Sequence, residues 1–194
     1  MKRALVGLLG GVAFAGFATW AAHAQQPAAD GARYNGASLI RPANYREWTF
    51  LAAGLGMTYD PSGGSSTAPK NFTNVFVNPS AYRAFSKDGK WPNGTVLLLE
   101  IRAAATEGSI NKGGNFQTDL RGLEAHVKDS RVPGGWAFFN FSDRQGLKDA
   151  AEPLNTEQAQ RCVDCHTQHG AVDTTFVQFY PTLIDVAKRA GTYK

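Results

Sequence analysis

The stretch TVLLLEIR, residues 95–102, is an almost unbroken apolar run that directly follows the dipeptide Asn93-Gly94. Asn-Gly is a frequent turn sequence, so it marks where the run begins. Because polar residues do not alternate with apolar ones, the run predicts a strand that is covered on both faces. The fold must therefore supply a layer of side chains on each side of this strand.

Two further segments have the composition of strands. Residues 74–77 are rich in β-branched side chains, and residues 135–141 (GWAFFNF) carry aromatic side chains on both alternating faces. The strands do not alternate regularly with helical segments, which disfavours a parallel sheet built from strand–helix–strand units. We therefore expect an α+β fold, a mainly antiparallel β-sheet with a few helices.

Two segments have the start and stop signals of helices. One begins at Asn78-Pro79, where asparagine is a good N-cap and proline suits the first helical position, and ends at Gly89. The other lies near the C-terminus, is started or kinked by Pro181 and stops at Gly191. The apolar residues that recur at helical spacing are Ala81, Tyr82 and Phe85 in the first helix, and Phe176, Phe179, Tyr180, Leu183, Ile184 and Ala187 in the second.

The first 24 residues have the layout of a secretory signal peptide. Lys2 and Arg3 precede a charge-free apolar run over residues 4–22, which ends in the small-x-small triplet AHA. An uncleaved membrane anchor is the alternative, since the run is nearly long enough to span a bilayer. We expect cleavage after Ala24, export to a bacterial periplasm and no membrane attachment afterwards.

The rest of the chain is expected to hold one domain. Residues 25–38 are rich in alanine and glycine and predict a flexible leader, which leaves residues 39–194 for the domain. Residues 60–70 (DPSGGSSTAPK) predict a loop within it. The 20 basic and 16 acidic residues give a net charge of only +4, which is too small for a nucleic-acid-binding surface. Two cysteines are too few for a scaffold held by disulfides.

Both cysteines lie in the segment Cys162-Val163-Asp164-Cys165-His166, which has the C-x-x-C-H pattern of covalent haem c attachment. Two thiols three residues apart lie on one face of a helical turn, where each can add to a vinyl group of haem. The histidine that follows is then an axial ligand of the iron. Thr156 as N-cap, Glu157 in the first turn and Gly170 at the end predict a helix around the motif, near the C-terminus.

Other interpretations of the two cysteines stay open. They could form a structural disulfide or a redox-active pair in an oxidising compartment, although no strand precedes the motif as it does in thioredoxin-like proteins. A zinc site would need more ligands, and the histidines that remain after signal cleavage are His126, His166 and His169.

The sequence offers few candidates for a sixth iron ligand opposite His166. Met57 is the one methionine beyond Met1, and methionine is the usual sixth ligand of electron-transfer cytochromes. His126 is flanked by charged residues, so we expect it on a surface or a strand, and His169 lies on the same predicted helix as His166. The remaining interpretation is a five-coordinate haem whose open side binds a small diatomic ligand or oxidises a substrate.

The sequence resembles the cytochrome P460 family, which includes the cytochromes c′-beta. The resemblance runs in family order over nearly the whole chain that follows the signal peptide, and is more specific than the C-x-x-C-H pattern alone. The matching stretches are residues 41–50 (RPANYREWTF), 74–85 (NVFVNPSAYRAF), 89–102 (GKWPNGTVLLLEIR), 122–130 (GLEAHVKDS), 135–141, and 162–166 followed by 173–183 (DTTFVQFYPTL).

The resemblance implies a mostly antiparallel sheet, a homodimer, and covalently attached haem c with His166 as proximal ligand and an open or water-occupied distal side. Enzymatic members oxidise hydroxylamine and carry a covalent bond from a lysine to the haem ring. The cytochromes c′-beta lack that bond, have an apolar distal pocket capped by phenylalanine, and bind nitric oxide or carbon monoxide.

One position separates the two branches. The lysine of the cross-linked members aligns with Leu99, and residues 95–102 contain no lysine. Leucine has no nucleophilic nitrogen, so a cross-link cannot form there. We therefore expect a protein of the c′-beta type that scavenges, carries or senses nitric oxide or a similar small ligand. The alternatives are an oxidoreductase acting on hydroxylamine or nitric oxide, and an electron carrier with Met57 as sixth ligand, which would need a redox partner protein.

The resemblance also implies further site residues. Glu157 aligns near the distal carboxylate that active members use to take protons from a nitrogen-containing substrate, and otherwise it is an ordinary acidic residue at a helix N-terminus. Phe72 and Phe76 are the candidates for the distal cap. The candidates for partners of the haem propionates are Arg46, Arg102 and Arg121.

Overall fold

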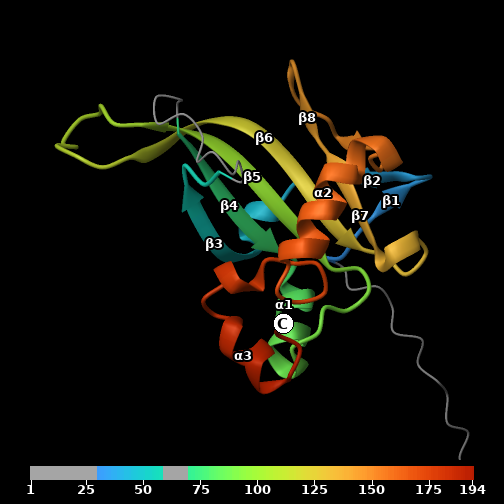
Figure 1. Cartoon of the computed structure of the whole chain (residues 1–194). Helices are drawn as coiled ribbons and strands as arrows, with labels where there is room; N and C mark the ends of the chain where they lie inside the picture. Colours follow the sequence, from blue (N-terminus) through green and yellow to red (C-terminus); the bar gives the residue numbers. More distant parts are fainter. Residues whose placement is uncertain (1–29, 59–69) are drawn as a thin grey trace, which may run out of the picture.

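The computed structural model describes residues 30–58 and 70–194 (Figure 1). The signal peptide expected at residues 1–24 lies outside the described residues, and so does the loop expected at residues 60–70 apart from Lys70. Within the described residues, no helix is long and apolar enough to cross a membrane.

A curved five-stranded sheet forms the centre of the molecule (Figure 1). Its middle strand contains almost all of the run TVLLLEIR. Every strand pairing in the described residues is antiparallel, so the prediction of an α+β fold with a mainly antiparallel sheet is confirmed. In the order in which they pair, the strands are β3 (Thr49–Leu55), β4 (Asn71–Val77), β5 (Val96–Ala105), β6 (Phe116–Lys128) and β7 (Trp136–Asn140).

Two small sheets complete the β structure of the described residues. One joins β1, β2 and β10, and the other joins β8 and β9. The chain is thus part of a sheet from Tyr34 onward, although its composition predicts a flexible leader up to Ser38. The partner of β2 on its far side comes from residues 150–151, and no local pattern reveals a pairing over that distance. The bounds are β1 (Tyr34–Asn35), β2 (Ser38–Ile40), β8 (Ser142–Asp143), β9 (Gly146–Leu147) and β10 (Ala150–Ala151).

The helix α1 (Pro79–Asp88) occupies the segment that Asn78-Pro79 and Gly89 delimit. Gly89 has a φ of 69°, a left-handed conformation that glycine adopts without strain and that ends the helix. The side-chain oxygen of Asn78 does not cap the helix, because it accepts a hydrogen bond from the Val96 N–H at 2.8 Å. Asn78 therefore ties α1 to the start of β5.

The C-terminal helix is shorter than its apolar spacing predicts. The segment starts with a 3-10 turn, η3 (Val177–Phe179), and α3 (Ile184–Arg189) begins only after Pro181. Proline lacks the N–H that a helix needs and disfavours helical geometry in the residue before it, so it separates the two pieces. The other 3-10 turns are η1 (Tyr45–Glu47) and η2 (Pro133–Gly135).

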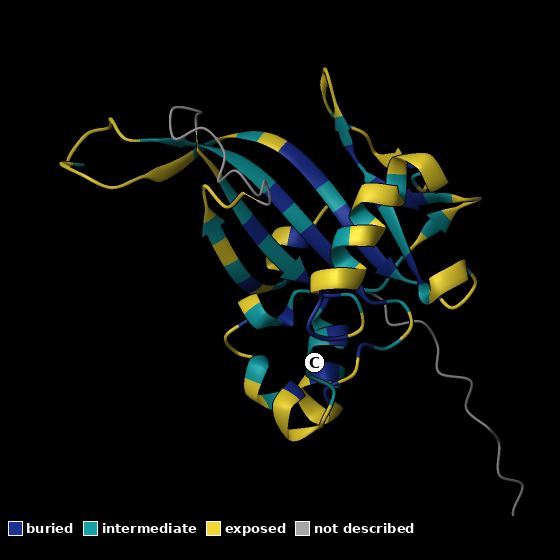
Figure 2. Ribbon diagram, in the orientation of Figure 1, coloured by how far each residue is buried: buried dark blue, intermediate teal, exposed yellow. Residues whose placement is uncertain are grey.

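Buried residues run along the strands of the main sheet (Figure 2), and they belong to two clusters. In β5, Leu97 belongs to the buried cluster that contains Phe85 and Leu183, whereas Leu98 belongs to the cluster that contains Phe141. The prediction that this strand is covered on both faces is therefore confirmed. The helices α1 and α3 pack together below one end of the sheet (Figure 1), and the face that Leu97 shares with them continues into the site.

Candidate functional site

The helix α2 (Thr156–His169) begins with a reciprocal cap. The Asn155 side chain accepts a hydrogen bond from the Gln158 N–H at 2.9 Å, and the Gln158 side chain accepts one from the Asn155 N–H at 3.2 Å. The prediction of Thr156 as the N-cap is therefore wrong by one residue. A cap at Thr156 would put Ala159 in the place of Gln158, and alanine cannot return the hydrogen bond.

One face of α2 carries the residues of the C-x-x-C-H motif. Gln158, Cys162, Cys165 and His166 recur at spacings of three and four residues, so they share one side of the helix. At a rise of about 1.5 Å per residue, Gln158 and His166 lie about 12 Å apart along the axis, with Cys162 midway. All four line a cavity of about 650 Å³ between α2, the main sheet and the C-terminal segment.

The main sheet forms the floor of this cavity in three rows of side chains that run across the strands. Neighbouring rows are two residues apart along each strand, which is about 6.8 Å. The first row contains Leu97, His126 and Phe138, the middle row Ala52, Val75, Leu99, Glu124 and Asn140, and the far row Gly54 and Thr73. His166 packs against the first row and Cys162 interacts with the middle one, so the far row lies on the side opposite His166.

His166 is held in one tautomer. Its Nδ1 atom lies 2.8 Å from the carbonyl oxygen of Thr174, so Nδ1–H donates a hydrogen bond and Nε2 keeps its lone pair. Burial lowers the pKa of His166 by more than the Thr174 carbonyl raises it, which favours the neutral ring. The ring packs against Phe176 and Phe138, with ring centres 4.4 Å and 5.0 Å away. A neutral imidazole with a free Nε2 is the form that binds a metal.

His126 lies beside His166 and not across the cavity from it. It belongs to β6, where its ring stacks on Phe138 at 4.2 Å and lies 4.6 Å from the His166 ring. The predicted strand position is confirmed, but the side chain is buried and not on the surface. Because the two imidazole rings are in contact, no haem plane fits between them, and His126 is not placed to be a sixth ligand. Neither ring nitrogen of His126 has a hydrogen-bond partner among the described residues.

The cavity fits haem c, which is the group that the C-x-x-C-H motif predicts. Its walls are mostly apolar, its volume lies in the usual range of ligand pockets, and Cys162 and Cys165 line it as free thiols. Burial raises the pKa of Cys162, which keeps it in the thiol form. Two thiols beside one imidazole with a free Nε2 are the donor set that attaches haem c.

The two phenylalanines expected as the distal cap lie on the opposite face of the sheet. Along β4, Thr73 and Val75 point into the cavity, so strand alternation turns Phe72 and Phe76 away from it. Phe76 packs against Tyr45, with ring centres 5.7 Å apart. The aromatic side chains that do line the cavity are Phe138, Phe139, Phe176, Phe179 and Tyr180.

Glu157, expected as a proton acceptor, is exposed in the first turn of α2 and is not among the residues that line the cavity. Gln158, one full turn before Cys162, lines the cavity instead, although it too is exposed. Sequence reasoning missed Gln158, and it missed the cavity residue Glu124. Helical spacing from Cys162 was the signal for Gln158, whereas Glu124 required the strand β6, which no sequence pattern had identified.

The three arginines that are candidates for partners of the haem propionates do not line the cavity. Arg46 and Arg102 form ion pairs with Glu100 on the face of the sheet that points away from the cavity, at 2.8 Å and 3.8 Å. Arg121 is exposed. Arg161 is the arginine that lines the cavity in the described part of the chain, and it directly precedes the first cysteine of the motif.

Met57 lies at the far end of the cavity, above the far row. Its sulfur packs so closely over Gly54 that a Cβ atom added to this glycine would overlap it. The Met57 side chain lines the cavity and is 41% exposed. Gly54 thus leaves the space in which the thioether rests.

Comparison with known proteins identifies the family of this fold and site. A comparison with curated proteins finds no match. The family model named Cytochrome P460 matches residues 42–177, which include all five strands of the main sheet and the C-x-x-C-H motif. This match covers most of the chain and implies haem binding. The protein is a haem-binding cytochrome and belongs to the cytochrome P460 family.

Proposed function

We propose that this protein is an exported cytochrome with one haem c whose open side binds nitric oxide or a similar small ligand. In this proposal Cys162 and Cys165 hold the haem through two thioether bonds, and His166 binds the iron through Nε2. The bound haem supplies an iron with a free coordination position. Such a protein scavenges, carries or senses its ligand.

The contrast between the two ends of the cavity carries this proposal. At one end, His166 lines the cavity with a free Nε2. At the other end, the far row consists of Gly54 and Thr73, neither of which is a ligand of haem iron, and the sulfur of Met57 rests on Gly54 above them. A small neutral ligand needs such a free position, and the apolar walls suit a gas better than an anion.

Leu99 supports the gas-binding branch of the family over the cross-linked one. It lies in the middle row, paired with Val75 and Glu124, and faces the cavity. Among the described residues that line the cavity there is no lysine. No amine is therefore placed there to attack the haem ring.

The ferrous holoprotein is expected to be high-spin and to take up carbon monoxide. An iron with a single protein ligand has an empty position that carbon monoxide fills without displacing a side chain. Absorption spectra with and without carbon monoxide test this, and a pyridine haemochrome spectrum identifies haem c. A low-spin ferrous spectrum that carbon monoxide leaves unchanged would contradict the proposal. A strongly red-shifted ferrous Soret band would reveal a cross-link and overturn the argument from Leu99.

An electron carrier is the second candidate, because Met57 does lie on the side of the cavity opposite His166. We expect Met57→Leu to leave the ferric and ferrous spectra unchanged, since leucine fills a similar volume and the thioether rests on Gly54. Leu55→Ala is the control, because Leu55 ends β3, the strand that contains Gly54, is 39% exposed and does not line the cavity. A change from low spin to high spin in Met57→Leu alone would identify the sulfur as a ligand and favour electron transfer.

Oxidation of hydroxylamine or nitric oxide with Glu157 as proton acceptor remains an alternative from the sequence. The exposed position of Glu157, outside the cavity lining, does not favour it. Export to the periplasm, assembly as a homodimer and electron exchange with a redox partner protein also remain predictions.

A further inference from the structure

Glu124 is the one acidic side chain among the described residues that line the cavity. It lies in the middle row, paired across the strands with Leu99 and Asn140, neither of which is charged. No described residue forms a hydrogen bond or an ion pair with its carboxylate. A carboxylate that is partly withdrawn from water without a partner is costly, so its position suggests a use.

The surroundings of Glu124 determine the pKa of its carboxyl group. Burial alone raises the pKa of its carboxyl group. Among the described residues, the other titratable side chains that line the cavity are Arg161, Cys162, Cys165 and His166 on α2, His126 on the same strand as Glu124, and Tyr180 in the C-terminal segment. The residues paired with Glu124 on β5 and β7 are Leu99 and Asn140, which do not titrate. Glu124 lines the same cavity as Cys162, the first haem-attachment residue, whose pKa is raised by burial and also by the charge of Glu124. Arg161 is exposed and forms no ion pair with it within the described residues.

We propose that Glu124 is a redox-linked proton acceptor. Its carboxylate takes up one proton when the haem held in the cavity gains an electron, and releases the proton when the electron leaves. The electron comes from a one-electron donor such as a reduced electron-transfer protein, and the proton comes from water. The single bond that forms is the O–H bond of the carboxylic acid. The inference rests on the proposed function, because it requires the haem that Cys162, Cys165 and His166 hold.

Electrostatics gives the direction of this coupling. An oxidised haem carries a positive charge that stabilises the anionic form of Glu124 across the cavity. Reduction removes that charge, and the carboxylate is left in a poorly hydrated site with no partner. The pKa of Glu124 is therefore higher in the reduced protein than in the oxidised one. Between those two values the reduced form binds more protons, so the midpoint potential falls as the pH rises.

The test is a spectroelectrochemical titration of the holoprotein from about pH 5 to about pH 9, a range that brackets a carboxyl group with a raised pKa. We expect the potential of the wild type to fall with pH, with a slope approaching one proton per electron. In Glu124→Gln the midpoint potential at high pH should be higher than in the wild type, because a negative charge has been removed. The part of the pH dependence that Glu124 causes should disappear. Haem propionates also titrate, so the quantity measured is the difference between the two proteins.

Two further variants separate a specific effect from a general one. Glu124→Asp keeps the carboxylate and should restore the slope. Asp164→Asn removes a negative charge from the exposed side of α2, between the two cysteines, and should leave the slope as in the wild type. The inference is wrong if Glu124→Gln retains the slope of the wild type, or if Asp164→Asn removes it equally. Carbon monoxide uptake, measured on the same samples, tests the proposed function independently, since either result can fail while the other holds.

Discussion

Replacing Cys162 and Cys165 together by alanine is expected to leave the protein with no covalently bound haem. Each thiol lines the cavity from the same face of α2, and each can form one thioether with a vinyl group. His166 alone holds haem by one coordinate bond, which denaturation breaks. Haem staining of a denaturing gel and the mass of the intact chain measure the loss directly.

The single variants make this prediction sharper. Cys162→Ala and Cys165→Ala should each keep haem attached through one thioether, with an altered pyridine haemochrome spectrum. Asp164→Ala is the control inside the motif, because its exposed side chain hydrogen-bonds only Gln160 at 2.7 Å in the described structure and should leave both thioethers in place. Haem that stays bound to the denatured double variant would show another site of attachment. A wild-type protein isolated with a Cys162–Cys165 disulfide and no haem would favour the disulfide interpretation.

The features that local sequence predicts well are those that depend on a few neighbouring residues. In the motif at residues 162–166, helical spacing alone places the two cysteines and the histidine on one face. The helix α1 begins at Pro79 and ends just before Gly89. The error at the start of α2 is also local. Asn155 and Thr156 are adjacent residues that are both good caps, and the side chain of Gln158 decides between them.

The floor of the cavity depends on strand register, which local sequence does not determine. Phe72 and Phe76 are the cap residues expected from the sequence, yet a shift of one residue along β4 exchanges the two faces of the sheet, and Thr73 and Val75 face the cavity. The strand β6 was not predicted, because charged residues interrupt its apolar pattern. Glu124 therefore entered the site only when pairing with β5 and β7 placed it there.

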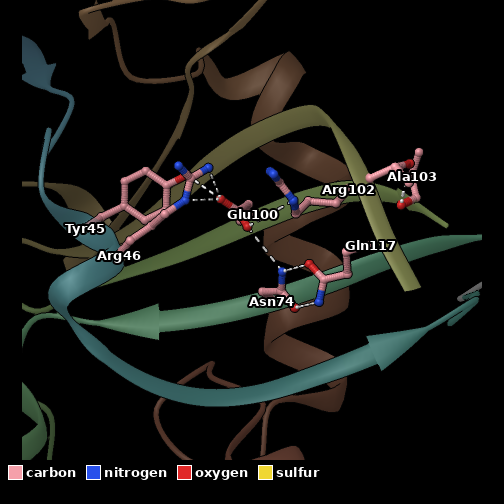
Figure 3. A network of polar contacts seen from close by, with 8 residues as sticks. Tyr45, Arg46, Asn74, Glu100, Arg102, Ala103 and Gln117 are labelled. Atoms are coloured by element: carbon pink, nitrogen blue, oxygen red, sulfur yellow. Dashed lines mark hydrogen bonds and ion pairs between the residues drawn. The ribbon is translucent and has the colours of Figure 1, made fainter. Parts of the chain in front are cut away.

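Replacing Glu100 by alanine is expected to lower the free energy of unfolding by about 3 kcal/mol, because it removes the acceptor of a buried charge network. Glu100 lies next to Leu99 in β5 but faces the other side of the sheet, where it is only 3% exposed (Figure 3). Tyr45 donates a hydrogen bond to it, as do Arg46 at 2.8 Å and Asn74 at 3.2 Å. We expect the lower end of the usual range because Arg46 can turn towards solvent when its partner is removed.

The pH dependence follows from the same contacts. Burial on its own would raise the pKa of Glu100, but the hydrogen bonds from Tyr45, Arg46 and Asn74 outweigh it and hold the pKa below its usual value. The network therefore stabilises the fold fully above the pKa of an unfolded glutamate, about 4.3, and this contribution is lost as the pH falls through the lower folded value. The stability difference between wild type and Glu100→Ala should shrink in acid.

Urea unfolding of the holoproteins at neutral pH and in acid measures both effects. Glu107→Ala is the matched control, since this glutamate is exposed in the loop between β5 and β6 and should change stability by less than about 0.5 kcal/mol. Glu100→Gln keeps the shape of the side chain and removes its charge, so it should retain part of the stability and lose the acid dependence. An alanine variant as stable as the wild type would mean that water replaces the carboxylate at little cost. The ordering of β5, which places Leu99 in the cavity, would then depend on its apolar contacts alone.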